Sequence, residues 1–256
     1  MSIRFASLGS GSKGNSTIID DGETCLLIDL GFSIKDAIRR LTRLEIHPTE
    51  IDAILVTHEH ADHCHGVAAF ARKFGTPVHL THGTYQRDSM GQLPKLNCFN
   101  CHASFQLGSF NVVPITVPHD AKEPCQFVLS SGLLTIGILT DLGHITPYVR
   151  EAYKHCDALL LECNHDLEML AKGPYPPRLK QRVGGDYGHL NNQQAAELLD
   201  TIDLERLHTL VISHISEQNN EPELALAAIK GHLKNWTGNL VLANQNDGLS
   251  WIKISA

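Results

Sequence analysis

A short histidine-rich segment constrains this chain more than any other part of its sequence. Residues 57–66 read T-H-E-H-A-D-H-C-H-G and directly follow the apolar run 51–56. The apolar run predicts a buried strand. Side chains two apart in an extended segment point the same way, so His58 and His60 can bind one metal ion together. The sequence therefore predicts a metal site where this strand ends.

The same segment offers ligands for a second ion. Asp62 and His63 come where the strand must end and the apolar pattern of a helix begins, so they can face a second ion beside the first. Imidazole together with carboxylate suits zinc, manganese or iron rather than calcium or magnesium. The alternative is a histidine-rich loop without metal, but chance rarely ends a buried strand with three histidines and a carboxylate so close together. We predict a binuclear metallohydrolase.

Three further ligand candidates follow apolar runs elsewhere in the chain. They are His119 in V-P-H-D-A, Asp141 in I-L-T-D-L-G and His214 in V-I-S-H-I-S. Loops converge on a site at the strand ends of open α/β sheets, so these positions can complete the metal site. Taken singly, each could instead be a solvent-facing turn histidine or an aspartate that caps the next turn.

Length and composition set the frame for this site. The 256 residues are 42% hydrophobic and 19% charged, enough to bury one core, and we expect a single domain over residues 1–256. No export signal and no apolar run of bilayer length is visible. Seven cysteines form an odd count without the spacing of a secreted framework, which fits a reducing compartment. We expect a cytoplasmic protein with no membrane association.

One cysteine motif has the form of a haem-attachment site. Cys98, Cys101 and His102 match the C-x-x-C-H pattern of c-type haem attachment. Such attachment is expected in an exported protein, so we reject it and leave open a surface thiol pair, an incidental metal contact or no role. Cys64 and His65 are expected to be first-turn residues of the helix after the ligands.

Strands and helices alternate along the chain. Helices are expected after the histidine-rich segment and at Ser33–Leu44, Asn192–Thr201 and Glu221–Leu233, with Ser33 as a cap. Strands are expected near Val78 and Phe105 and at Ile3–Leu8, Ser16–Asp20, Cys25–Asp29, Phe110–Val117, Cys125–Ser130 and Leu133–Thr140, then in a second half at Ala158–Glu162, Thr209–Ser213, Asn239–Leu242 and Leu249–Ile254. The pattern predicts an α/β fold, an αββα four-layer sandwich.

These motifs together resemble the metallo-β-lactamase fold superfamily. The resemblance covers the full length and includes Asp29 in L-L-I-D-L-G, for which it implies a structural role. It also implies two divalent metal ions. One ion would be held by His58, His60 and His119 and the other by Asp62, His63 and His214, with Asp141 bridging them.

A narrower resemblance points to one family of this fold. The segments S-G-S-K-G-N-S, L-E-C-N-H-D, G-P-Y-P-P-R-L-K-Q-R-V, Y-G-H-L-N-N and S-H-I-S-E-Q-N-N-E-P-E are similar to the bacterial YycJ (WalJ) family, which is associated with DNA exonuclease activity. The chain departs from the expected pattern at Asn191, where serine is expected. The resemblance implies a 5′-to-3′ DNA exonuclease.

The chemistry of such a site follows from its ligands. Metal ions lower the pKa of bound water to roughly 7, so a hydroxide bridging two ions is the expected nucleophile, with Asp62 orienting it. His189 in Y-G-H-L is our candidate for protonating the leaving 3′ oxygen, because imidazole suits proton transfer at neutral pH. The preceding Gly188 would allow close approach of the backbone to substrate. The alternative for His189 is an ordinary histidine at the start of a helix.

The net charge of −7 argues against a nucleic-acid substrate, because phosphate-binding proteins tend to be basic. Local basic residues soften this objection. Several lie in a Pro/Gly-rich loop leading to His189, where Tyr175 could stack on a base. The predicted substrate-binding residues are Ser12, Lys13, Asn15, Asn164, His165, Lys180 and Arg182.

Other activities share this set of ligands. An RNA-processing or small cyclic-nucleotide phosphodiesterase is the nearest alternative. A glyoxalase-II-like thioesterase would need a helical substrate domain that the sequence does not show. Hydrolysis of β-lactams usually belongs to exported proteins, and a non-catalytic nucleic-acid-binding module would most readily have lost ligands. The sequence leaves any protein partner unspecified.

Overall fold

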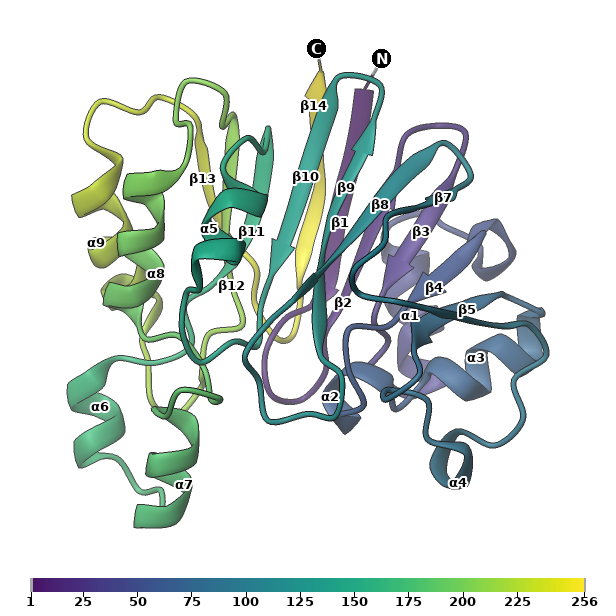
Figure 1. Ribbon diagram of the computed structural model, residues 1–256, viewed down its shortest axis with the longest axis horizontal. Helices are drawn as coiled ribbons and strands as arrows, with labels where there is room; N and C mark the ends of the chain where they lie inside the picture. The colour runs from purple at the N-terminus through teal and green to yellow at the C-terminus, as the bar shows by residue number, and fades with distance from the viewer. Residues whose placement is uncertain (1, 256) are drawn as a thin grey trace.

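Two seven-stranded sheets pack face to face in the computed structural model, which describes residues 2–255 (Figure 1). The first sheet has the order β14 (Leu249–Ser255), β1 (Ser2–Gly9), β2 (Ser16–Asp20), β3 (Cys25–Ile28), β4 (Ala53–Leu55), β5 (Val78–Thr81) and β6 (Leu96–Phe99). The second has the order β13 (Asn239–Leu242), β12 (Thr209–Ser213), β11 (Ala158–Glu162), β10 (Leu134–Leu139), β9 (Cys125–Ser131), β8 (Phe110–Thr116) and β7 (Phe105–Leu107).

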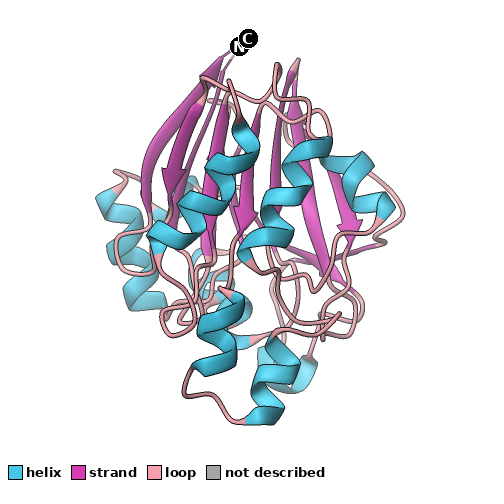
Figure 2. Ribbon diagram, turned by 90° about the vertical axis from the view of Figure 1, so that its left-hand side faces the viewer, coloured by secondary structure: helices cyan, strands magenta, loops and turns pink. Residues whose placement is uncertain are grey.

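Helices cover the outer faces of both sheets, so the predicted αββα architecture is confirmed (Figure 2). On the first sheet lie α1 (Ile34–Arg43) and α3 (Val67–Phe74), and on the second lie α5 (Pro147–Tyr153), α8 (Asn192–Leu198) and α9 (Pro222–Leu233). The connections contain α2 (Ala61–Cys64), α4 (Arg87–Met90), α6 (Leu167–Lys172), α7 (Pro177–Val183) and the 3-10 turns η1 (Pro48–Glu50) and η2 (Leu199–Thr201). Among residues 2–255, no helix combines the length and apolar character needed to cross a membrane.

Strand β1 shows how the sandwich explains the apolar runs of the sequence. Ile3 and Phe5 pack in the core between the sheets, whereas Ala6 and Leu8 pack beneath the helices of the first sheet. All four are fully buried. Because both faces of the strand are covered from Phe5 onward, the neighbouring apolar residues Phe5 and Ala6 face opposite layers, and apolar residues do not strictly alternate with polar ones.

Two of the sequence predictions differ from the structure. The Pro/Gly-rich region before His189 is predicted as a loop, but it contains the helices α6 and α7, and Pro177 occupies the first turn of α7, where proline is tolerated. The last strand is predicted in the second half, but β14 pairs antiparallel with β1 in the first sheet. By contrast, Ser33 caps α1 as predicted, since its hydroxyl accepts from the Asp36 N–H at 3.3 Å.

The parallel strands bring their carboxyl ends to one edge of the sandwich. Strands β3 to β6 run parallel in the first sheet, and β10 to β13 run parallel in the second. Asp29 directly follows β3, Asp141 is the second residue after the end of β10, and His214 directly follows β12. The fold therefore delivers polar side chains from distant parts of the chain to one place.

Candidate metal centre

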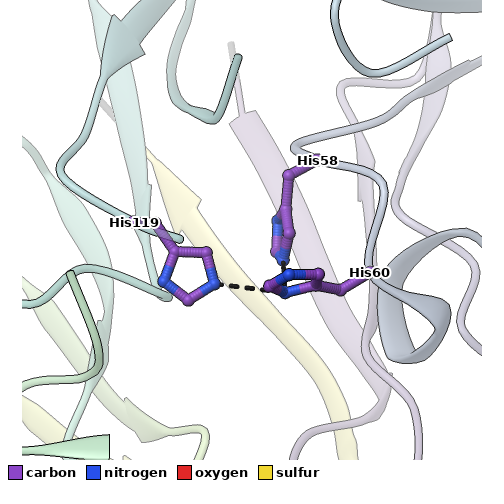
Figure 3. Close-up of side chains that lie close together, drawn as sticks. All are labelled: His58, His60 and His119. Carbon is purple, nitrogen blue, oxygen red and sulfur yellow. Dashed lines mark hydrogen bonds between the residues drawn. The ribbon is translucent and has the colours of Figure 1, made fainter. Parts of the chain in front are cut away.

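Three histidines form one group at this edge (Figure 3). His58 Nε2 lies 3.1 Å from His60 Nδ1, and His119 Nε2 lies 3.3 Å from the same atom. Strand β4 ends at Leu55, so His58 and His60 lie in the following loop and at the start of α2 rather than on the strand itself. The pair converges as predicted, but the loop produces this convergence instead of strand alternation.

The other predicted ligands lie directly beside this group. Asp62, His63 and His214 form a second set with compatible ligand spacing, and His58, His63 and Asp141 form a third. His63 Nε2 lies 3.4 Å from Asp62 Oδ2 and 3.3 Å from Asp141 Oδ2. Because the third set shares His58 with the first and His63 with the second, Asp141 lies between the two groups.

The electrostatics of these side chains fit a bound cation. Two buried atoms, Asp141 Oδ2 and His214 Nε2, lack a hydrogen-bond partner within the described residues. Burial opposes charge on His214, but the carboxylates of Asp141 and Asp62 raise its pKa to about 10. Burial likewise opposes charge on His63, whose pKa those carboxylates raise well above its usual value. The group attracts positive charge, and its nitrogen and oxygen donors suit zinc, manganese or iron.

A buried carboxylate orients the histidines from behind. The Thr57 N–H donates to Asp29 Oδ1 at 2.8 Å, and the Thr57 hydroxyl donates to Asp29 Oδ2 at the same distance. Asp29 Oδ2 also lies 2.8 Å from His63 Nδ1, while the Thr57 hydroxyl lies 3.0 Å from His58 Nδ1. Such partners fix the ring orientation of metal-binding histidines. The structural role expected for Asp29 stays a prediction that this geometry favours.

The backbone at three of these positions is unusual. Asp29, Asp141 and His214 have φ angles of 60°, 53° and 52°, in the left-handed region that side chains other than glycine rarely adopt. Each such residue costs about 1–2 kcal/mol. Strained positions of this kind persist where the surrounding structure fixes them, and they gather at functional sites.

Glu162 is the polar residue at this edge that sequence reasoning missed. It is fully buried at the end of β11, where its Oε2 lies 3.2 Å from His189 Nδ1 and 3.1 Å from His214 Nδ1. It also accepts from the backbone N–H groups of Leu190 and Asp141. The available signal is its place as the last residue of the apolar run A-L-L-L-E, the criterion that selects the other candidates.

His189 lies at the mouth of the group with about 20% of its side chain exposed. Its Nδ1 faces Glu162, and its ring lines the same cavity as Asp62 and His214. A Cβ atom on Gly188 would lie 2.2 Å from the carbonyl oxygen of Arg182. The close approach of the α7 end therefore requires a glycine here, and approach of substrate to the Gly188 backbone stays a prediction.

The predicted substrate-binding residues divide into two sets. Ser12, Asn164 and Arg182 line a cavity of about 340 Å³ together with the candidate ligands. The other set does not line it. Lys13 is exposed and pairs with Glu217, the Lys180 ammonium donates to the Ala171 carbonyl, and His165 and Asn15 are buried.

Asn15 and His165 differ from each other in their surroundings. The Asn15 amide nitrogen lies 3.3 Å from Asp62 Oδ2 and 3.1 Å from His63 Nε2. Both ring nitrogens of His165 lack a partner among the described residues, and burial lowers its pKa to about 4. Substrate contact by either residue stays a prediction, and Asn15 is placed to hold candidate ligands.

The C-x-x-C-H segment lies apart from these side chains. Cys98 is exposed on the edge strand β6, whereas Cys101 is buried among apolar residues between the sheets. The two thiols therefore do not form a surface pair, which corrects that alternative. Cys64 is the last residue of the single-turn helix α2, and its thiol donates to the Glu59 carbonyl at 3.1 Å, while His65 caps the end of that helix.

The fold and the clustered side chains define a class, the metal-dependent hydrolases of the metallo-β-lactamase fold. Residues 24–215 match the family described as the beta-lactamase superfamily domain. The chain belongs to this superfamily and, within it, to the family of the WalJ and YycJ exodeoxyribonucleases.

Three similar proteins illustrate this membership. Exodeoxyribonuclease WalJ of Streptococcus pneumoniae serotype 2 is 34% identical over 87% of this chain and 85% of that protein. Exodeoxyribonuclease YycJ of Bacillus anthracis is 31% identical over 90% of this chain and 88% of that protein. The metallo-β-lactamase fold protein YhfI of Bacillus subtilis is 14% identical, with a TM-score of 0.75 over 99% of this chain and all of that protein. That structural likeness shows the fold alone.

Proposed function

We propose that this protein is a cytoplasmic DNA exonuclease that uses two divalent metal ions to hydrolyse phosphodiesters from the 5′ end. One observation carries the proposal: seven candidate ligands with nitrogen or oxygen donors form one cluster, and four of them line a cavity together with His189. Two of the seven have a buried atom without a hydrogen-bond partner among residues 2–255. The names of the two exodeoxyribonucleases support DNA as the substrate.

The ions are assigned to the two groups of ligands. When bound, zinc, manganese or iron would supply a Lewis acid and an activated water. Asp62 is partly exposed toward the cavity, and Asn15 holds its Oδ2 from behind. Asp62 can therefore accept a hydrogen bond from the attacking water. We assign His58, His60 and His119 to one ion, Asp62, His63 and His214 to the other, and Asp141 to both.

His189 is placed to move the proton that the reaction needs. With Nδ1–H donated to Glu162, its Nε2 is free to carry the transferred proton. The water oxygen bonds to phosphorus, the bond from phosphorus to the 3′ oxygen breaks, and that oxygen takes the proton from His189. The proton lost by water passes to solvent, and His189 regains one from solvent. Glu162 acts here as a positioning residue that stabilises the charged imidazole.

The local charges reconcile this substrate with a net charge of −7. Arg182 lines the cavity and pairs with Asp120, while Lys13 pairs with Glu217 at 2.6 Å. Each cation is exposed enough to exchange its carboxylate for a substrate phosphate. The site can thus hold the phosphates next to the scissile bond without a broad basic surface.

The test is digestion of end-labelled duplex DNA by protein reconstituted with manganese or with zinc. Stepwise release of nucleotides from the 5′ end, absent in Asp62→Ala, is the expected result. His155→Ala serves as a control because that exposed histidine pairs with Asp203 away from the cavity.

The same assay separates the alternatives. Intact DNA together with degraded RNA would reassign the protein to RNA processing. Turnover of a cyclic nucleotide alone would reassign it to small phosphodiesters. Release from the 3′ end would keep the exonuclease and reverse the proposed polarity.

A further inference from the structure

The α6–α7 segment, residues 167–183, stands out from the sandwich at the edge that carries the candidate metal centre (Figure 1). Helix α7 buries none of its residues, whereas α8 and α9 each bury several. Short helices are marginal in water unless an apolar face packs against the protein. The position of α7 therefore needs an explanation other than core packing.

Side chains of this segment face the cavity instead of the core. Tyr175, Leu179 and Arg182 line it together with Asp62 and His189. Tyr175 and Leu179 are half-buried there. Apolar groups that remain partly exposed beside polar catalytic groups mark a ligand surface. The cavity volume of about 340 Å³ lies at the low end of small-ligand sites.

Two ion pairs bound this cavity. Arg182 reaches across to Asp120, whose Oδ1 lies 3.6 Å from His119 Nε2, so α7 is joined to the rim of the metal centre. A second pair, Lys13 with Glu217, joins the loops whose neighbouring residues Ser12 and Ser216 also line the cavity. These pairs lie at the rim of the cavity, whose volume of about 340 Å³ suits one small ligand rather than a continuing strand.

We propose that Tyr175, Leu179 and Arg182 form an end wall that accepts one terminal nucleotide, so that the enzyme cuts only the first phosphodiester. This inference rests on the proposed exonuclease function. Tyr175 stacks on the terminal base, Leu179 contacts the same base, and Arg182 takes a phosphate in place of Asp120. The terminal nucleotide is then the leaving group, and its 3′ oxygen lies on the side of His189.

The experiment compares products and KM on linear duplex DNA and on covalently closed circular DNA. Wild type should release mononucleotides from linear DNA and leave closed circles intact. The double variant Tyr175→Ala/Leu179→Ala should release dinucleotides and longer products, nick closed circles, and raise KM for linear DNA about fivefold or more, the effect of one lost stacking contact. Tyr175→Phe should restore the wild-type KM because the ring is retained.

Tyr148→Ala is the matched control, since Tyr148 is an exposed tyrosine on α5 that does not line the cavity. Both mutated side chains are only half-buried, and thermal melting will verify that the variants fold. Unchanged product lengths and KM in the double variant would overturn the end wall, as would nicking of closed circles by wild type.

The failure of the proposed function looks different in the same assay. Wild type would then release no nucleotide from linear DNA while it hydrolyses a small diester such as bis(p-nitrophenyl) phosphate. That outcome overturns both proposals together. Release of mononucleotides by wild type and by all variants overturns the end wall alone.

Discussion

The candidate metal centre and the α6–α7 segment meet at one cavity but are built in different ways. The ligands of the centre lie at or near strand ends and are held by buried partners such as Asp29 and Glu162. Helix α7 buries no side chain; it is joined to the rest of the site by the ion pair from Arg182 to Asp120 and by the backbone hydrogen bond from the His189 N–H to the Val183 carbonyl. The two sheets thus position the candidate metal ligands, whereas a weakly packed helix lines the space for substrate.

This difference has an energetic side. The centre contains left-handed backbone at Asp29, Asp141 and His214. The packed strands that precede these residues keep the backbone in this strained conformation. The segment 167–183 contributes little to the core, so changes there should alter substrate choice at small cost in stability. Substitutions in the two regions should therefore separate turnover, metal content and folding.

The largest effect is expected from a lost ligand. Asp141→Ala removes the carboxylate that lies between the two groups, so we expect metal content to fall below two per chain and turnover to drop roughly 1000-fold or more, since metal ions supply several kcal/mol of stabilisation. Elemental analysis of dialysed protein and the DNA digestion assay measure the two effects. His58→Ala should behave alike. Full metal content in Asp141→Ala would remove that residue from the ligand set.

His189→Ala should slow turnover by roughly 10²–10⁴-fold, the range for a lost general acid, while metal content stays at the wild-type value. The residue needs this test because His189, Asp141, Glu162 and His214 also satisfy ligand spacing as a group. Metal analysis of the variant distinguishes the two roles. A loss of metal would make His189 a ligand and exclude it as the proton donor.

The sequence could predict where the candidate ligands gather because they follow apolar runs that form strands. His119, Asp141 and His214 were found by this criterion, and the structure brings them beside the histidine-rich segment. Glu162 meets the same criterion, but a carboxylate at a strand end also suits a surface turn, and its burial depends on pairing between β10, β11 and β12. Only the tertiary structure supplies that information.

The α6–α7 segment could not be predicted for a related reason. Its prolines and glycines indicate a loop by local preference, and α7 has no buried face whose periodicity would reveal a helix. Pro177 fits because it stands in the first turn. The placement of β14 was missed because antiparallel pairing with β1 joins the two ends of the chain, which no local pattern encodes.

Thr57→Val tests the hydrogen bond to Asp29 that orients the candidate ligands, and we expect a smaller effect on metal binding than for Asp141→Ala. The substitution keeps the shape but removes the hydroxyl that donates to Asp29 Oδ2. Asp29 Oδ2 keeps its contact with His63 Nδ1 and so loses one of two partners, and loss of a supporting partner typically weakens metal binding roughly 10–100-fold. Competition with a chromogenic chelator measures the affinity. Thr57→Ser retains the hydroxyl and should bind as wild type, and equal affinity in Thr57→Val would show that Asp29 needs no such donor.

The smallest effect on stability is expected for a substitution on α7. Leu179→Ala on α7 should change the free energy of unfolding by no more than about 0.5 kcal/mol, as for surface positions. Leu161→Ala, in the fully buried core beneath the helices of the second sheet, should cost about 2–5 kcal/mol. Urea unfolding measures both, and an unchanged slope would show that the denatured state is the same. A loss of more than about 1.5 kcal/mol in the free energy of unfolding for Leu179→Ala would approach the cost of a mild Leu→Ala substitution in a core. It would mean that α7 folds as part of the core. Its position would then be explained by packing, and the division between a rigid centre and a weakly packed end wall would no longer hold.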